Sequence, residues 1–228
     1  MTQGEIVATE LGDHGQRAHF TPVREALTLA DGRHVVVRPI RARDAEALQA
    51  FFAALSPRSR HRRFHLGVNA LSQTMLRSLT EVDQHHHIAL VALADSNVGE
   101  GDPTIVAEAR YVLLTDCCDA EFAIAVDDDW QSVDLGRMLL RRIVEDARRA
   151  GNRRLVGDLL ADNLPMRALV QKLGGRIIAH PESTRLRRAI FDTTDLSVGW
   201  TKNLPEQSRE PRMGGLDLRP NHQLPSPR

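Results

Sequence analysis

One segment, DDDWQSVDLGRMLLRRIVEDARRAG (127–151), strongly constrains what this chain can fold into. It follows the apolar run AEFAIAV and leads, through a short loop, into a helix pattern in which Leu139, Ile143 and Ala147 share one face. Arginines occupy much of the opposite face. A loop that passes from a strand into a helix N-terminus presents backbone N–H groups and the positive end of the helix dipole. The segment therefore predicts a strand–loop–helix unit that can bind an anion.

The rest of the chain alternates between strand and helix patterns. Strands are predicted at 33–40, 87–93, 104–114, 120–126, 154–160, 176–179 and 185–192, and helices at 44–55, 72–79, 135–150 and 166–173. The turns DSNVGEGDP and TDCCD join the strands at 87–93, 104–114 and 120–126 into an antiparallel meander. The order β-α-α-β-β-β-α-β-α-β-β predicts an α/β fold with a mixed sheet and a βαβ crossover in its second half.

Two local expectations concern the first helix. Asp44 is placed to cap its N-terminus, and Ala45, Leu48, Phe51, Phe52 and Leu55 form its apolar face. The following stretch, SPRSRHRRFH (56–65), is expected to end this helix and form a solvated loop. Its arginines leave open a second interpretation, in which the loop lies on the substrate side and attracts an acidic surface.

The charge balance and the cysteines narrow the class of protein. Lys+Arg and Asp+Glu are both 30, so a general nucleic-acid binder is not expected. The only two cysteines, Cys117 and Cys118, are adjacent, which excludes a disulfide framework and favours the cytoplasm. Neither a signal peptide nor a membrane span is expected. The histidines at 85–87 lack partners at metal-ligand spacing, so no metal site is predicted.

Composition also divides the chain. Residues 1–24 are polar without a clear period, and residues 201–228 are rich in Pro, Arg and Ser. We interpret both as flexible tails around a single domain at 25–200.

Three segments together resemble the GNAT (Gcn5-related N-acetyltransferase) superfamily over about residues 33–195. They are VRPIRARDAEALQAFFAALSPRSRHRRF, AEFAIAVDDDWQSVDLGRMLLRRIVEDARRAG and RLVGDLLADNLPMRALVQKLGG. Within the superfamily the chain looks most like the acetyltransferase domain of bacterial protein-lysine acetyltransferases. The resemblance implies the GNAT acyltransferase fold, acetyl-CoA as co-substrate and an amine acceptor, for which a protein lysine is a candidate.

The resemblance also places the cofactor contacts. They are expected at Ile124, Ala125, Val126, Gln131, Ser132, Val133, Asp134, Leu135, Gly136, Arg137 and Asn163. Backbone groups of 124–126 would hold the pantetheine arm, and the loop 131–137 would hold the pyrophosphate. The family's loop pattern is Gln/Arg-x-x-Gly-x-Gly/Ala, and Asp134 stands where its first glycine belongs.

Asp134 raises two alternatives. It can cap the helix, a common role for aspartate, and it tolerates left-handed backbone geometry better than most residues. A carboxylate about 5 Å from a phosphate would instead weaken binding by roughly 3 kcal/mol at an effective dielectric of about 20. Arg137 and Arg141, on the first turns of the helix, could offset that charge.

Amine acetylation needs a proton acceptor, because a lysine amine has a pKa of about 10.4. By resemblance Glu121, at the start of AEFAIAV, is the candidate general base, and the plain alternative is an exposed strand glutamate. Glu108 is a weaker candidate. The tyrosine that protonates the thiolate in many GNAT enzymes is replaced by Val170, and the only tyrosine, Tyr111, lies on another strand.

The sequence thus predicts an acetyl-CoA-dependent N-acetyltransferase with Glu121 as base. The alternative is a catalytically weak GNAT-fold module that senses acyl-CoA or binds a protein. The altered loop and the missing tyrosine favour the alternative, whereas Glu121, Gln131, Gly136 and Asn163 favour the enzyme.

Overall fold

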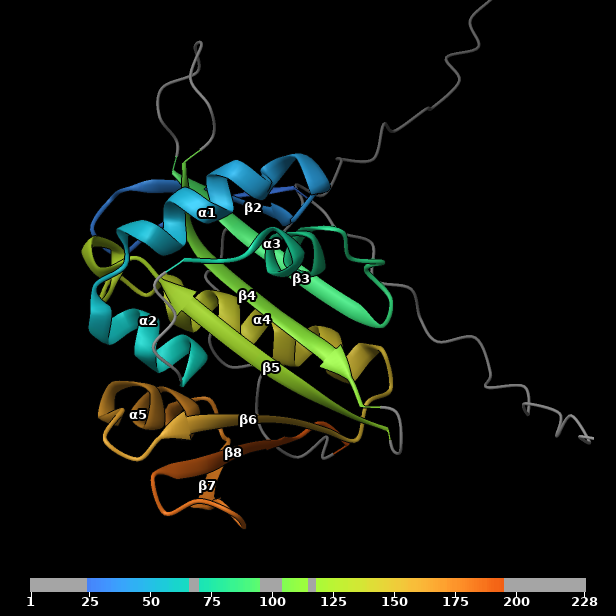
Figure 1. Ribbon diagram of the computed structural model, residues 1–228. Helices are drawn as coiled ribbons and strands as arrows, with labels where there is room; N and C mark the ends of the chain where they lie inside the picture. The colour runs from blue at the N-terminus through green and yellow to red at the C-terminus, as the bar shows by residue number, and fades with distance from the viewer. Residues whose placement is uncertain (1–23, 66–69, 95–103, 115–117, 195–228) are drawn as a thin grey trace, which may run out of the picture. The chain divides into compact units, whose positions relative to one another are not determined.

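A computed structural model describes residues 24–65, 70–94, 104–114 and 118–194 (Figure 1). Within these residues eight strands form one sheet in the order β1-β2-β3-β4-β5-β6-β8-β7. The strands are β1 (Glu25–Thr28), β2 (His34–Pro39), β3 (His87–Ala94), β4 (Ile105–Leu113), β5 (Asp119–Val126), β6 (Arg154–Leu160), β7 (Arg176–Ala179) and β8 (Leu186–Asp192). Neighbouring strands are antiparallel except β5 and β6, which are parallel. The mixed sheet with one βαβ crossover is therefore confirmed.

Helices cover both faces of the sheet. They are α1 (Ala45–Ala54), α2 (Pro57–Phe64), α3 (Gln73–Thr80), α4 (Leu135–Arg149) and α5 (Leu164–Lys172), with short 3-10 turns η1 (Ala42–Asp44) and η2 (Asp128–Trp130). Side chains alternate along β4: the Tyr111 hydroxyl donates to Asp146 of α4, whereas Arg110 reaches the Leu79 carbonyl of α3. Accordingly α1 and α3 lie on one face and α4 on the other, as Figure 1 shows.

The core forms where the predicted apolar faces meet the sheet. Leu139, Ile143 and Ala147 of α4 are at most 1% exposed, as their spacing predicts. On the opposite face Leu48, Phe51, Phe52 and Leu55 are buried with β3 residues. Burial of these apolar side chains supplies most of the driving force that fixes α1 and α4 against the sheet.

Residues 57–64 form helix α2, so the predicted loop is wrong here. The hydroxyl of Ser56 accepts the Ser59 backbone N–H at 3.2 Å, Pro57 occupies the first turn, and His65 ends the helix with a φ of 56°. The many arginines conceal this helix in the sequence, because only Phe64 supplies a large apolar side chain. Polar anchors hold it instead, including hydrogen bonds from Ser56 and Ser59 to the Asp128 carboxylate.

Asp44 has a different role from the one predicted. It makes no side-chain hydrogen bond to the N-terminus of α1. Its carboxylate is buried and accepts two hydrogen bonds from Arg38, at 2.6 and 2.8 Å, and one from the Arg41 backbone N–H. Arg38, the penultimate residue of β2, therefore captures the carboxylate that would otherwise cap the helix. Strand β1 is a further element that the sequence patterns did not predict.

Other expectations fall at or beyond the edges of the described residues. The predicted tails at 1–24 and 201–228 lie outside the described residues, except for Arg24, and they remain predictions. Cys117 and the predicted turn at 95–103 also lie outside the described residues. No helix in the described ranges is long and apolar enough to cross a membrane. Among the same residues no cluster of three His, Cys, Asp or Glu side chains could hold a metal, and His86 pairs with Asp83.

Candidate active site

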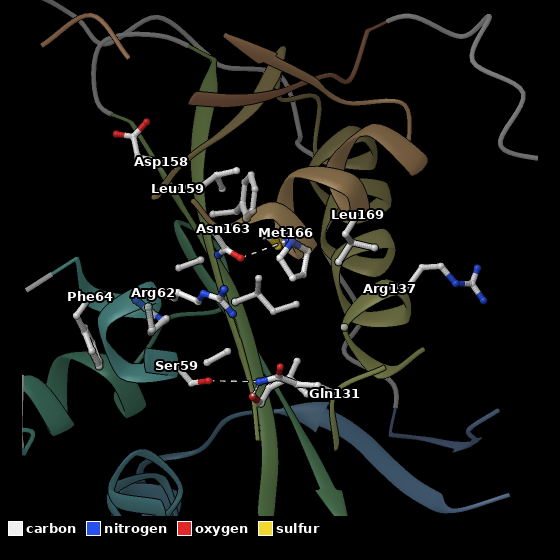
Figure 2. Close-up of a pocket in the computed structure, with 18 of the residues that line it drawn as sticks. Ser59, Arg62, Phe64, Gln131, Arg137, Asp158, Leu159, Asn163, Met166 and Leu169 are labelled. Carbon is white, nitrogen blue, oxygen red and sulfur yellow. Dashed lines mark hydrogen bonds between the residues drawn. The ribbon is translucent and has the colours of Figure 1, made fainter. Parts of the chain in front are cut away.

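A cavity opens where strands β5 and β6 separate. The two strands pair only from Asp119 with Arg154 to Glu121 with Val156, although β5 continues to Val126 and β6 to Leu160. The cavity has a volume of about 580 Å³, and α2, the loop before α4 and the start of α5 complete its walls (Figure 2). This size is ordinary for a small-molecule site.

The separation leaves one edge of β5 unpaired. The Asp127 backbone N–H donates to Val106 of the β4 segment at 2.9 Å, and the Asp119 carbonyl accepts from Leu114, so odd-numbered residues of β5 turn their backbone groups to β4. The backbone groups of Ile124 and Val126 consequently face the gap. Ala125 turns its backbone to β4 and lines the cavity with its side chain. An extended ligand with amide groups can pair with such an edge.

The loop before α4 presents a second set of free donors. Among the described residues no acceptor is found for the backbone N–H groups of residues 132–137, and the first helical hydrogen bond runs from Met138 to the Asp134 carbonyl at 3.0 Å. Ser132 and Asp134 have φ values of 65° and 72°, so the expectation that Asp134 tolerates left-handed geometry is confirmed. Left-handed Asp134 is followed by right-handed Leu135, and such a pair turns successive N–H groups to the same side as an anion-binding nest.

The Asp134 side chain does not cap α4. It accepts from Arg137 Nε at 2.9 Å and from Nη2 at 2.6 Å, and it makes no hydrogen bond to the helix N-terminus. The capping interpretation is therefore wrong. Hydrogen bonding by Arg137 lowers the pKa of Asp134, so the carboxylate is ionised but neutralised. Arg141, the other expected partner, pairs with Glu145. Figure 2 shows Arg137 pointing away from the cavity.

Gln131 and Asn163 hold the walls together. Gln131 Nε2 donates to the Val126 carbonyl at 3.2 Å and to the Ser59 hydroxyl at 3.3 Å, which ties α2 to the loop (Figure 2). Asn163 lines the cavity and accepts the Met166 backbone N–H at 3.4 Å at the start of α5, so it acts as an N-cap as well.

Most, but not all, of the sequence-predicted contacts meet at this cavity. Those that line it are Ile124, Ala125, Val126, Gln131, Ser132, Asp134, Gly136, Arg137 and Asn163, together with Glu121. Val133 and Leu135 do not line it, and the Leu135 side chain is fully buried in the core. These two positions can contribute only backbone groups.

Glu121 lies where the strands begin to separate. Its side chain is exposed and lines the cavity, and it makes no hydrogen bond or ion pair with any residue described. Glu108 is in the opposite situation, being fully buried and ion-paired with Arg110 and with Arg63. Burial alone would raise the pKa of Glu108, but the charges of Arg110 and Arg63 outweigh it and lower that pKa. Glu108 does not line the cavity.

Sequence reasoning missed Asp158, which faces the cavity from β6. Its carboxylate accepts two hydrogen bonds from Arg188, at 2.8 and 3.0 Å, and one from His180 Nε2 at 3.0 Å. His180 Nδ1 accepts the Glu182 backbone N–H, which assigns the ring hydrogen to Nε2. Burial opposes ionisation of Asp158, but the bonds from Arg188 prevail and lower its pKa. An acid inside the apolar strand RLVGDLL was the available signal.

No tyrosine hydroxyl reaches the cavity. The position expected for one, Val170, is completely buried, and the chain's single tyrosine, Tyr111, donates to Asp146 on the other face of the sheet. Leu169 of α5 lines the cavity beside Met166.

The chain is similar to known acetyltransferases in sequence and in fold. Residues 49–175 match the family described as the acetyltransferase (GNAT) family. Acetyltransferase PA5475 of Pseudomonas aeruginosa is 35% identical over 147 residues, which is 64% of this chain and 77% of the relative. Acetyltransferase Pat of Mycolicibacterium smegmatis is 28% identical over 158 residues, 69% of this chain but only 45% of Pat. The crystal structure of the GNAT domain of S. lividans PAT superposes with a TM-score of 0.66 at 26% identity, covering 74% of this chain and 96% of that one.

Proposed function

This chain belongs to the GNAT acetyltransferase family and is an acyl-CoA-dependent transferase; on that premise we propose that it acetylates a protein lysine with Glu121 as the general base. The observation that carries the proposal is the position of this carboxylate. Glu121 marks the fork of β5 and β6, where an unpaired strand edge and an anion-binding loop meet in one cavity.

The free backbone groups suit the two parts of acetyl-CoA. The N–H groups of residues 132–137 at the start of α4 fit the pyrophosphate, which the helix dipole also favours. The outward-facing backbone groups of Ile124 and the Val126 N–H fit the amides of the pantetheine arm, whereas the Val126 carbonyl is held by Gln131. This arrangement directs the thioester toward the fork and Glu121, with Asn163 beside the arm. Acetyl-CoA supplies the activated acyl group, and the chain's own residues position it and move the proton.

Glu121 would accept the proton that the attacking amine must lose. A lysine ammonium has a pKa of about 10.4, so at neutral pH few molecules are ready to attack without a base. Glu121 makes no hydrogen bond or ion pair with a described residue, and Arg188, the described cation on which its charge acts, already pairs with Asp158, so Glu121 can take this role. The leaving thiol has a pKa of about 8.5, so the thiolate can depart without the tyrosine that this cavity lacks.

The relatives support a lysine acceptor. The subgroup resemblance to protein-lysine acetyltransferases, and the likeness to Pat and to the GNAT domain of S. lividans PAT, favour a protein substrate. The arginines of α2, one wall of the cavity, favour an acidic partner surface. The low cysteine content favours a cytoplasmic location.

Two measurements test the proposal. Isothermal titration with acetyl-CoA should show binding, and CoA release should be faster with lysine peptides than with small amines of equal concentration. Turnover confined to small amines would exclude the lysine acceptor. Binding without turnover across the whole panel would identify an acyl-CoA sensor, and no binding at millimolar acetyl-CoA would contradict the assigned cavity.

A further inference from the structure

One half-buried cation in the cavity wall makes no hydrogen bond or ion pair with a described residue. Arg62 lines the cavity from α2, and its Nη2 atom is buried without a hydrogen bond to any described residue. Buried donors are normally satisfied, so an orphaned one needs an explanation. The other buried side-chain atoms without a hydrogen bond in the described residues belong to residues outside the cavity wall.

The other arginines of α2 are accounted for. Arg60 donates to the carbonyls of Ala53 and Leu55, and Arg63 pairs with Glu108. Arg58 is exposed and lies outside the cavity wall. Arg62 is therefore the cation that α2 contributes to the cavity without a counter-charge.

The cavity holds one unpaired group of each sign. Of the ionised side chains that line it, Asp134 pairs with Arg137, Asp158 with Arg188 and Arg63 with Glu108. Burial lowers the pKa of His65, so this ring is neutral at pH 7. Glu121 and Arg62 remain, and no ion pair joins them to each other or to another described residue. The charge of Glu121 acts on Arg188, but Arg188 is already paired with Asp158.

Arg62 lies midway along the cavity. Ser59, about one helical turn before it, contacts Gln131 of the loop before α4, and His65, about one turn after it, lines the cavity at the C-terminal end of α2. In Figure 2 the labelled side chains follow the same order, from Ser59 and Gln131 past Arg62 to Asn163 and Asp158. The pantetheine arm that would cross this middle region is uncharged, so the cofactor offers Arg62 no anion there.

We propose that Arg62 binds a carboxylate that the acceptor carries close to its reactive amine, while Glu121 receives the amine. The proposal rests on the function assigned above and narrows its substrate class to lysines beside an acidic group. A guanidinium partly removed from water gains most from a planar carboxylate, which accepts two parallel hydrogen bonds. Charge-assisted bonds of this kind correspond to about a tenfold or larger gain in affinity.

Two matched pairs of acceptors provide the test. One pair is a lysine peptide flanked by Asp and the same peptide flanked by Asn; the other is Nα-acetyl-lysine and its carboxamide. Each pair is compared by kcat/KM for acetylation and, independently of turnover, by the Kd for protein saturated with CoA. We expect the carboxylate member to be favoured about tenfold. The pair that shows the preference identifies whether a side-chain or a terminal carboxylate is bound.

The variants Arg62→Gln and Arg58→Gln separate this role from others. Arg62→Gln should abolish the preference without changing the Kd for acetyl-CoA, and Arg58→Gln, an exposed neighbour outside the cavity, should keep it. If the wild-type protein shows the same kcat/KM and Kd for the carboxylate and amide members of both pairs, the inference is wrong but the proposed function is not affected. If no acceptor is acetylated, the proposed function is wrong, and the Kd comparison still decides the inference. An equal loss of kcat with all acceptors in Arg62→Gln would place Arg62 at the thioester and contradict the inference.

Discussion

The Asp134 carboxylate and the Arg137 guanidinium are joined by two hydrogen bonds, of 2.9 and 2.6 Å, across the first turn of α4. Asp134 occupies the position at which the GNAT loop pattern has a glycine, directly beside the N–H groups that fit a pyrophosphate. The ion pair explains how an acid can stand there. Its charge is cancelled by Arg137, and its left-handed backbone keeps the loop on the path that a glycine would give it.

We predict that Arg137→Gln weakens acetyl-CoA binding by about fivefold. Without Arg137 the Asp134 charge is no longer cancelled and repels the phosphates. The Asp134 side chain is 41% exposed, so solvent reduces this repulsion below the roughly 3 kcal/mol expected for a carboxylate about 5 Å from a phosphate. Isothermal titration at low salt measures the Kd. Asp134→Asn combined with Arg137→Gln should restore it. Arg141→Gln, one turn along the same helix, serves as control, and an unchanged Kd in Arg137→Gln would show that the carboxylate does not influence the phosphate site.

We predict that Glu121→Gln lowers kcat by about 10²- to 10⁴-fold, the usual contribution of a general base. The acetyl-CoA Kd and the free energy of unfolding should hardly change, because the side chain is exposed and makes no hydrogen bond or ion pair with a described residue. Steady-state kinetics with a fixed lysine peptide measures the effect, and Glu46→Gln, an exposed glutamate on α1 outside the cavity, is the control. Loss of less than threefold would assign Glu121 a plain surface role.

Comparison of these residues shows how far the sequence could predict the site. The loop, Glu121 and Asn163 lie in short segments that match the family's pattern, so the resemblance could place them, and all of them line the cavity. Asp158 and Arg62 are not local, because the first needs the parallel β5–β6 register and the second needs α2 to be a helix packed against the loop. Asp44 and Asp134 failed as predicted caps for one physical reason. In each case a nearby arginine offers a charged partner that displaces the weaker bond to a helix N–H.

We predict that Glu108→Gln destabilises the fold by about 3–5 kcal/mol, because it leaves the charges of Arg63 and Arg110 buried together without a counter-ion. Urea unfolding monitored by circular dichroism measures the change in free energy of unfolding. Glu46→Gln should stay within about 0.5 kcal/mol of the wild-type protein. If Glu108→Gln instead retained full stability and lost turnover, Glu108 rather than Glu121 would be the catalytic carboxylate.

The same buried network makes stability depend on pH through His87. Burial, followed by the charge of Arg110, lowers the pKa of His87 to about 4, and its Nε2 accepts a hydrogen bond from Arg110 at 2.8 Å. In the unfolded chain a histidine has a pKa of about 6.5, so between these two values the unfolded state binds more protons than the folded state. The contribution is therefore present above pH 6.5 and is lost as the pH falls toward 4.

We predict that in His87→Gln the free energy of unfolding falls by about 1 kcal/mol less on acidification than in the wild-type protein. This value is smaller than the full shift in the pKa of His87 would give, because the ring is partly solvated. Glutamine keeps an acceptor for Arg110 but cannot bind a proton, so the free energy of unfolding should fall less between pH 7 and pH 5 than in the wild-type protein. Urea titrations at both pH values measure the difference. His34→Gln, on the exposed side of β2, should retain the wild-type slope. Equal slopes for His87→Gln and the wild-type protein would mean that His87 titrates alike in both states and that the Arg110 contact does not hold it neutral.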